Sequence, residues 1–168
     1  RIDEGKIKII KTPTVLDELI DSVMVKFHKR YPQQEVYLDL PEDIIIIPMD
    51  AILIEQVIVN LLENCVLHAD GMTKIWLIVT EDGDQVKFSV EDDGAGIKES
   101  VLPRMFDGSF QSEDGKESDS KRNMGIGLSV CKSIIDAHRG KVWAENKIDG
   151  GAKISFTLPL EEEEQNGD

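Results

Sequence analysis

Residues 50–70 read DAILIEQVIVNLLENCVLHAD. The stretch is long enough for a helix and is apolar on most of its surface, so we expect it to be largely buried. Polar side chains recur at every fourth position and would form one stripe along this helix: Gln56, Asn60, Asn64 and His68. Burying a side-chain amide without a partner costs about 1–3 kcal/mol. The stripe must therefore face something polar, either other side chains and buried water or a ligand.

The composition around this stretch indicates one folded domain. The chain has 168 residues, of which 40% are hydrophobic and 31% charged. Its formal net charge of −14 argues against nucleic acid or an anionic membrane surface as a partner. Cys65 and Cys131 lie in apolar stretches without metal-ligand spacing, so we expect buried free thiols. We find neither a membrane-spanning stretch nor a signal peptide, and the opening Arg1 indicates a fragment of a longer protein.

The rest of the chain alternates between strand and helix patterns. Alternating or apolar runs predict strands at residues 6–10, 34–39, 44–47, 73–80, 85–92, 141–146 and 152–158. Helical spacing predicts three helices: one from Thr14 to about Lys29, one from Asp50 to about Asp70, and one from Met124 to about His138. It also predicts a helical turn at residues 99–106. We therefore expect an α/β (α+β) two-layer sandwich, in which about three helices cover one face of a mixed, mostly antiparallel sheet.

One predicted strand ends in a carboxylate. Alternation along residues 85–92 places four side chains on one face: Val86, Phe88, Val90 and Asp92. If this is the core face, Asp92 stands at the inner end of an apolar wall; the alternative is an Asp that only starts a turn. Gly94 and Gly96 follow, and their missing Cβ atoms would let a flat ligand approach the backbone. An ionised carboxylate beside an apolar slot suits a ligand with an amino group, such as adenine.

A second glycine pair, Gly125 and Gly127, stands just before an apolar helix. Helix N-termini with small residues bind phosphate through free N–H groups and the helix dipole, although such a pair is as often a flexible turn. The pattern matches neither a Rossmann fingerprint nor a P-loop. Asn60 and Asn64 can supply neutral oxygen ligands to Mg²⁺, which proteins usually hold with few side chains plus substrate phosphates. A single Mg-ATP would satisfy the amides, the carboxylate and the glycines together.

Four motifs, in order and over nearly the whole chain, resemble the ATP-binding catalytic domain of sensor histidine kinases. They are Asn60-Leu-Leu-Glu-Asn64 (N box), Asp92-Asp-Gly94-Ala-Gly96 (first glycine box), residues 102–110 (F box) and residues 123–128 (second glycine box). That family belongs to the superfamily of gyrase, Hsp90, MutL and histidine kinases, so the resemblance implies the Bergerat ATP-binding fold. Residues 137–143 and 149–159 most resemble the Kdp-type, potassium-responsive sensor kinases.

The resemblance also implies roles for individual residues. Asn64 would coordinate Mg²⁺, Asn60 would help position the metal or a phosphate, and Asp92 would accept a hydrogen bond from the adenine amino group. The other implied ATP contacts are His68, Gly94, Gly96, Ile97, Phe106, Gly125, Ile126, Gly127 and Leu128. Residues 107–122, which are nearly devoid of apolar side chains, would close as an ATP lid, and its cations Lys116, Lys121 and Arg122 are possible phosphate contacts.

Several positions depart from the family pattern. Leu67 replaces a frequent Lys of the N box, Asn123 replaces the first glycine of the second glycine box, and the F box has one extra residue between its aromatics. The ATPase branches of the superfamily carry a general-base Glu four residues before the metal-binding Asn, where this chain has Asn60. Glu63 would point to a different helix face. Histidine phosphotransfer is therefore favoured over fast ATP hydrolysis.

The phospho-acceptor of a histidine kinase is not expected in this fragment. None of His28, His68 and His138 stands in the His-Glu or His-Asp pair of the family's acceptors, so the fragment should bind Mg-ATP without phosphorylating itself. We expect residues 1–5 to end a dimerisation and phospho-acceptor helix, residues 6–160 to form the catalytic domain and residues 161–168 to be an acidic tail.

The implied partners are the missing dimerisation domain and a response regulator. We expect the fragment to be a monomer, without contact to nucleic acid or membrane, from the cytoplasmic part of a membrane-anchored kinase. Two alternatives stay open: a degenerate nucleotide-binding module that signals through its lid without phosphotransfer, and a plain interaction domain with glycine-rich turns.

Overall fold

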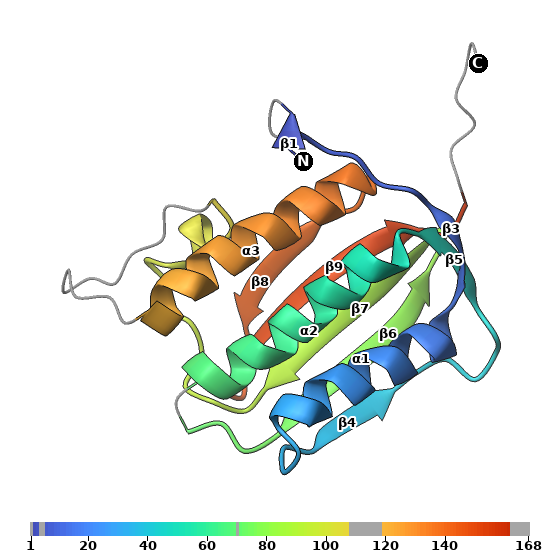
Figure 1. Cartoon of the computed structure of the whole chain (residues 1–168). Coiled ribbons are helices and arrows are strands. Elements are labelled where there is room, and N and C mark those ends of the chain that lie inside the picture. Colours follow the sequence, from blue (N-terminus) through green and yellow to red (C-terminus); the bar gives the residue numbers. More distant parts are fainter. Residues whose placement is uncertain (1, 4–5, 70, 108–118, 162–168) are drawn as a thin grey trace.

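The computed structural model describes residues 2–3, 6–69, 71–107 and 119–161, with the backbone only for residues 2–3, 6, 68 and 119–126. These residues form two layers, in which three long helices cover one face of a five-stranded sheet (Figure 1). The helices are α1 (Leu16–Arg30), α2 (Ala51–His68) and α3 (Asp119–Ala137). None of the helices in the described residues has the length and apolarity that a bilayer crossing requires.

The order of strands in the sheet confirms the expected fold class. It runs β4 (Val36–Asp39), β6 (Ile75–Asp82), β7 (Gln85–Asp92), β9 (Ala152–Pro159) and β8 (Val142–Asn146). Only β4 and β6 pair in parallel, and the other neighbours are antiparallel. The predicted hairpin at residues 81–84 turns at Gly83, whose φ of 66° favours glycine. A 3-10 turn at Leu102–Arg104 matches the predicted helical turn.

The N-terminal segment differs from expectation. Only Lys6–Ile7 (β2) of the predicted strand 6–10 is extended, and it pairs with Ile2–Asp3 (β1). Thr14 is not a helix cap: it lies in β3 (Thr12–Val15), which pairs with β5 (Ile46–Met49). The first N–H of α1, at Leu16, instead donates to the carbonyl of Ile45 (2.9 Å). A partner distant in sequence therefore satisfies this helix end, and residues 2–3 are not helical.

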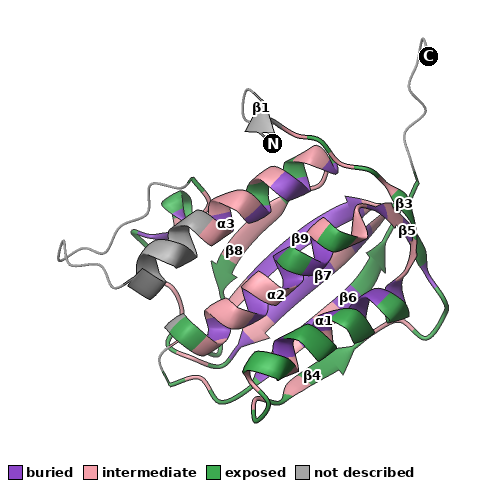
Figure 2. Ribbon diagram, in the orientation of Figure 1, coloured by how far each residue is buried: buried purple, intermediate pink, exposed green. Residues whose placement is uncertain are grey.

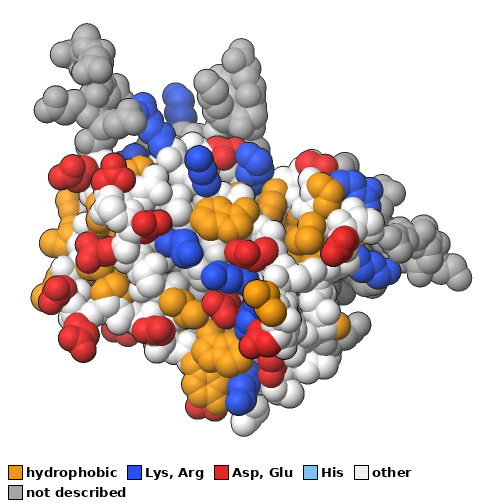
Figure 3. Space-filling model, turned by 180° about the vertical axis from the view of Figure 1, so that it is seen from behind, with side chains coloured by type: hydrophobic (Ala, Val, Ile, Leu, Met, Phe, Trp, Pro, Cys, Tyr) orange, Lys and Arg blue, Asp and Glu red, His pale blue; other side chains and the backbone are white. Residues whose placement is uncertain are grey.

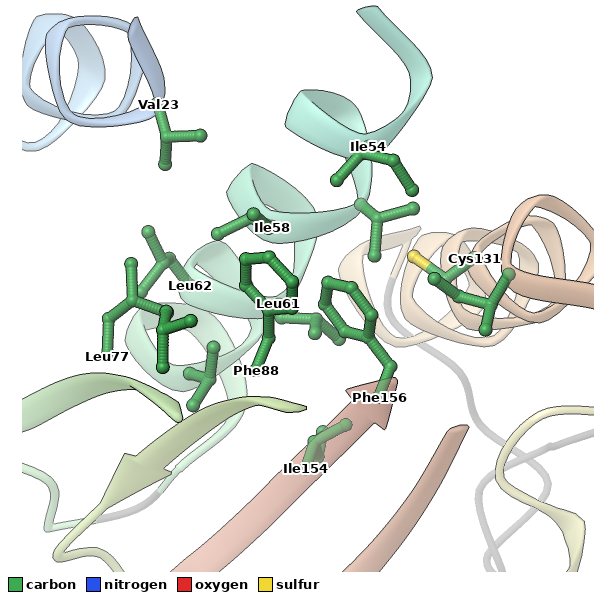
Figure 4. Close-up of a cluster of buried hydrophobic side chains, with 14 of the residues drawn as sticks. Val23, Ile54, Ile58, Leu61, Leu62, Leu77, Phe88, Cys131, Ile154 and Phe156 are labelled. Carbon is green, nitrogen blue, oxygen red and sulfur yellow. The ribbon is translucent and has the colours of Figure 1, made fainter. Parts of the chain in front are cut away.

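Helix α2 occupies the middle of the helical layer, above β7 and β9 (Figures 1 and 2). Asp50 caps it as predicted, accepting from the N–H of Leu53 (3.5 Å). Six of its side chains enter the core: Ile54, Val57, Ile58, Leu61, Leu62 and Cys65. Ile58, Leu61 and Leu62 lie towards Phe88 and Phe156, whose rings stack 4.7 Å apart (Figure 4). Ile52, expected in the buried part, is 76% exposed because it lies on the far side of the first turn.

Helix α3 begins five residues earlier than predicted. It starts at Asp119 rather than at Met124, because the intervening polar residues are compatible with a helix and an acidic residue suits its first turn. Residues 108–118 of the predicted lid lie outside the described residues. At the other end, Gly140 donates to the carbonyl of Ile135 (3.0 Å), and a Cβ on Gly140 would overlap the carbonyl oxygen of Thr157.

The face of the sheet away from the helices mixes charged and apolar side chains (Figure 3). On this face Trp76 of β6 lies 6.1 Å from the ring of Tyr37 of β4, centroid to centroid. The ammonium of Lys147 lies 4.6 Å from the centroid of the Trp76 ring and 3.3 Å from the carboxylate of Glu91. Lys147 thus ties the turn after β8 to the central strands.

Candidate functional site

Helices α2 and α3 pack together and run antiparallel (Figure 1), and Asn60 and Asn64 stand one turn apart on one face of α2. A Cβ on Gly127 of α3 would lie only 2.5 Å from Nδ2 of Asn60, so glycine is what lets the helices approach here. Nδ2 of Asn64 is buried and has no hydrogen-bond partner among the described residues. Such an atom costs about 1–3 kcal/mol unless water or a ligand accepts from it. The predicted stripe is thus partly covered and partly unsatisfied.

Asp92 ends β7 at the inner end of an apolar wall, as the alternation predicted. Val86, Phe88 and Val90 are buried, and Asp92 is itself only 5% exposed. Its Oδ1 accepts from the N–H of Gly94 (2.8 Å) and from the N–H of Ala152 (3.4 Å). Oδ2 receives neither of these bonds. Asp92 therefore begins a turn and is also a buried carboxylate, so both interpretations of this residue describe part of its environment.

Cys65 joins the amide side of the site to the carboxylate. Burial raises the pKa of its thiol well above the ordinary value, and the neighbouring Asp92 carboxylate raises it further through charge and hydrogen bonding. The thiol is therefore neutral; it donates to the carbonyl of Leu61 (3.6 Å) and lies beside the Asp92 carboxylate. Cys65 directly follows Asn64, so the carboxylate lies beside the same turn of α2 as the unsatisfied amide, with the two side chains on different faces of that turn. The sequence predicted a buried thiol here but not this contact; Cys131 is buried and free as well.

Two side chains that the sequence analysis missed hold the loop after Asp92. Asp93 accepts from the N–H of Thr73 (2.7 Å), the hydroxyl of Thr73 (2.6 Å) and the N–H of Lys74 (2.9 Å), which keeps the pKa of this carboxyl far below its usual range. Asn146, at the end of β8, pairs with both backbone groups of Ile97. The acidic pair in the glycine motif could have suggested the first contact, but no local pattern indicates the second.

The remaining predicted residues divide into three groups. Ile97 and Phe106 are half-buried against the core, whereas Leu128 is fully buried within it, which leaves only its backbone to approach a ligand. The phosphate interpretation of the second glycine pair was wrong in one respect: Gly125 and Gly127 lie inside α3, so they are not the free N–H groups of its first turn. The side chains of His68, Lys121, Arg122 and Ile126, and all of Lys116, lie outside the described residues.

Two of the three histidines are engaged in structural contacts. His138 is fully buried; its Nδ1 donates to the carbonyl of Ile134 (2.8 Å), and its Nε2 accepts from the N–H of Asp50 (3.0 Å). Burial lowers the pKa of this imidazole, so it is neutral. His28 is half-buried, and its Nε2 contacts the carbonyl of Gln34 (3.0 Å). Neither ring is presented as a nucleophile.

The family of histidine kinase-, DNA gyrase B- and HSP90-like ATPases matches residues 49–162, which contain the amides, the carboxylate and both glycine motifs. The chain belongs to this family. Sensor protein KdpD of Clostridium acetobutylicum is 40% identical over 161 residues, which are 96% of this chain and 18% of that protein. KdpD of Escherichia coli is 30% identical over 159 residues, 95% of this chain and 17% of that protein. The predicted likeness to Kdp-type kinases is confirmed.

Solved structures give the same result for the fold. The catalytic domain of histidine kinase ThkA, in a nucleotide-free form, superposes with a TM-score of 0.73 at 28% identity and covers 90% of this chain and 98% of that chain. The chain is thus an ATPase-type catalytic domain of the sensor histidine kinases. It spans less than a fifth of the length of the two KdpD relatives.

The donor set of the site fits a hard cation held partly by a ligand. The described residues contain no group of three or more His, Cys, Asp or Glu side chains that could hold a metal. The amide oxygens of Asn60 and Asn64 are the kind of ligand that Mg²⁺ accepts when phosphates complete its shell. When bound, Mg²⁺ would neutralise phosphate charge beside these two amides.

Proposed function

We propose that this domain binds Mg-ATP and supplies its γ-phosphate to a histidine on a dimerisation domain of the same sensor kinase. The observation that carries the proposal is the buried Nδ2 of Asn64, which lacks a partner among the described residues in a region that also contains the buried Asp92. An unpaired amide in such a place is explained if a ligand completes its hydrogen bonding.

The site residues divide between the two ends of the nucleotide. Asp92 would accept from the adenine amino group through Oδ2, because the N–H groups of Gly94 and Ala152 already donate to its Oδ1. Asn64 and Asn60 would ligate Mg²⁺ and orient phosphate. Gly127 would serve by leaving space beside the Asn60 amide, while the base would pack on the half-buried Ile97.

Phosphotransfer is favoured over hydrolysis by the environment of Glu63. Its Oε2 accepts from Arg30 of α1 at 2.9 Å, on the side of α2 away from Gly127. Glu63 is therefore committed to an ion pair instead of activating water. The position of the general base in the ATPase branches is occupied by Asn60, which has no basic group.

The partners follow from the same proposal. The structure of ThkA in complex with the response regulator TrrA superposes on this chain with a TM-score of 0.72 at 28% identity. We infer that the kinase containing this domain likewise passes phosphate to a response regulator. The rings of His28 and His138 are both hydrogen-bonded, which is consistent with an acceptor on another domain.

One observation favours the alternative of a module that binds nucleotide without transferring phosphate. Leu67, at the position of the frequent N-box Lys, is 51% exposed and offers no charge to phosphate. Binding and transfer must therefore be tested separately.

Calorimetry with ATP, with and without Mg²⁺ and with GTP as control, tests the first half of the proposal. Adding a separately expressed acceptor domain and radiolabelled ATP tests the second half. We expect Mg²⁺-dependent ATP binding, little GTP binding and acid-labile phosphate on the acceptor alone. Absence of ATP binding would refute the function, whereas binding without transfer would favour the alternative.

A further inference from the structure

The turn between β8 and β9 is attached to the loop that follows Asp92. Oδ1 of Asn146 accepts from the N–H of Ile97 (2.7 Å), and Nδ2 of Asn146 donates to the carbonyl of Ile97 (2.8 Å). The side-chain amide thus pairs with both backbone groups of one residue. This pairing fixes the orientation of the amide, because a flipped amide would place like groups together.

Gly96 makes this pairing possible. Its φ of 87° is one that residues with side chains rarely adopt, and a Cβ there would lie 2.8 Å from Oδ1 of Asn146. The space beside Gly96 is therefore occupied by the Asn146 amide. The glycine was expected to admit a flat ligand; in the structure it admits the side chain that fastens the loop.

The same turn also fastens the start of the loop. The N–H of Ala152 reaches Oδ1 of Asp92, and a Cβ on Gly151 would overlap the carbonyl oxygen of Asp92. Nζ of Lys147 lies 3.4 Å from that carbonyl oxygen. Residues 92 and 97, the two ends of the segment expected to contact adenine, are thus both held by residues 146–152.

We propose that Asn146 is a positioning residue for adenine binding, which holds Ile97 and Gly96 in the conformation that the base requires. The inference rests on the proposed function. It predicts that loss of the amide allows the loop to open, so that each binding event must first order it. Asn146 is itself exposed and lies outside the core, so its effect on folding should be small.

The test compares Asn146→Ala with Ile148→Ala, a fully exposed residue of the same turn. Loss of two hydrogen bonds should weaken ATP and ADP alike by about tenfold, because both share the base. Hydrogen exchange at the Ile97 amide should become much faster, while the Thr73 amide, held by Asp93, stays protected. The Ile148→Ala variant should match wild type in every measurement. Unfolding temperatures provide the check on folding.

A second variant keeps the inference testable if Asn146→Ala folds poorly. Asn146→Asp has nearly the same shape, but at neutral pH it places a carboxylate oxygen against the carbonyl of Ile97. Its affinity for ADP relative to wild type should be low at pH 7.5 and recover only towards pH 4, where an aspartic acid with a pKa of about 3.9 becomes protonated and regains one donor and one acceptor. A merely structural role would not give this pH profile.

The outcomes separate the inference from the function on which it rests. Wild-type protein that binds no ATP would refute the proposed function. Normal wild-type binding with an unchanged Kd in both Asn146 variants would refute the positioning role alone, as would an Ile97 amide whose exchange does not respond to Asn146→Ala.

Discussion

The polar side chains on the two sides of helix α2 differ in whether they have partners. Towards α1, Glu55 pairs with Lys26 and the hydroxyl of Ser22, and Glu63 pairs with Arg30, so both carboxylates have partners. Towards α3, Asn60 faces a glycine and Nδ2 of Asn64 has no partner among the described residues. A polar side chain on a buried helix therefore indicates a ligand only where the protein itself provides no hydrogen-bond or ion-pair partner for it.

The largest expected effect is on the unsatisfied side. Asn64→Ala should weaken Mg²⁺-dependent ATP binding by about a hundredfold, because it removes the proposed metal ligand. Thermal stability should change little, since the variant also removes an unpaired buried amide. Calorimetry and thermal unfolding measure the two effects. Gln56→Ala, at the exposed start of the same stripe, should be silent in both. If Asn64→Ala bound Mg-ATP with nearly the wild-type affinity, the α3 side of α2 could no longer be distinguished from the α1 side as the ligand-binding side.

Next in size is the effect of Asp92→Asn. The amide oxygen can still accept from Gly94 and Ala152, so the loop should remain, but adenine meets a different donor and acceptor pattern. We expect ATP affinity to fall by at least about tenfold and the preference over GTP to shrink. The matched control is Asp93→Asn, whose carboxylate binds Thr73 and Lys74; it should keep the ATP preference. Equal ATP affinity in wild type and Asp92→Asn would contradict the assigned role.

On the satisfied side, Glu55→Ala should affect stability and not binding. Burial would raise the pKa of Glu55, but hydrogen bonds from Lys26 and Ser22 and the charge of Lys26 outweigh it and lower the pKa. Because Lys26 and Ser22 are exposed and can be hydrated in the variant, we expect a loss of about 1 kcal/mol, or about 2–4 °C in Tm. ATP affinity should be unchanged. A clear loss of nucleotide binding would show that this side also belongs to the site.

The smallest expected effect is a pH dependence of stability that arises from His138, which bonds to Asp50 at the start of α2. Burial lowers the pKa of this imidazole, so below the unfolded-state value of about 6.5 the unfolded chain takes up a proton that the fold excludes. Stability should therefore be complete above that pH and fall as the pH drops, until the folded-state pKa is reached. Between pH 7 and 6 the loss is at most about 0.7 kcal/mol. Denaturant titrations of wild type and His138→Gln should reveal it as a difference in slope with pH.

Much of the fold could be predicted from the sequence because its signals are local. The period-2 pattern of residues 85–92 and the capped apolar run from Asp50 set β7 and α2 correctly. The errors occurred where distant partners decide. Leu16 starts α1 because Ile45 accepts from its N–H, and β3 exists because β5 lies beside it. No pattern near Thr14 contains that information.

The candidate site divides in the same way. Asp92 could be placed from strand alternation, and Asn60 and Asn64 from helical spacing. Asn146 could not be found, because its contact with Ile97 joins residues 49 positions apart and depends on the register of β8 with β9. The neighbour of Gly96 could not be predicted for the same reason: the sequence shows a missing side chain but not the Asn146 amide that lies beside it.

The most direct test of the contrast across α2 is an NMR titration of the isotope-labelled domain with Mg-ADP. We expect large shifts of the side-chain amide signals of Asn60 and Asn64, and of the backbone from Asp92 to Ile97. We expect little change at Lys26, Arg30 and the exposed Gln56. Shifts concentrated on the α1 side, with the Asn64 amide unmoved, would contradict this expectation.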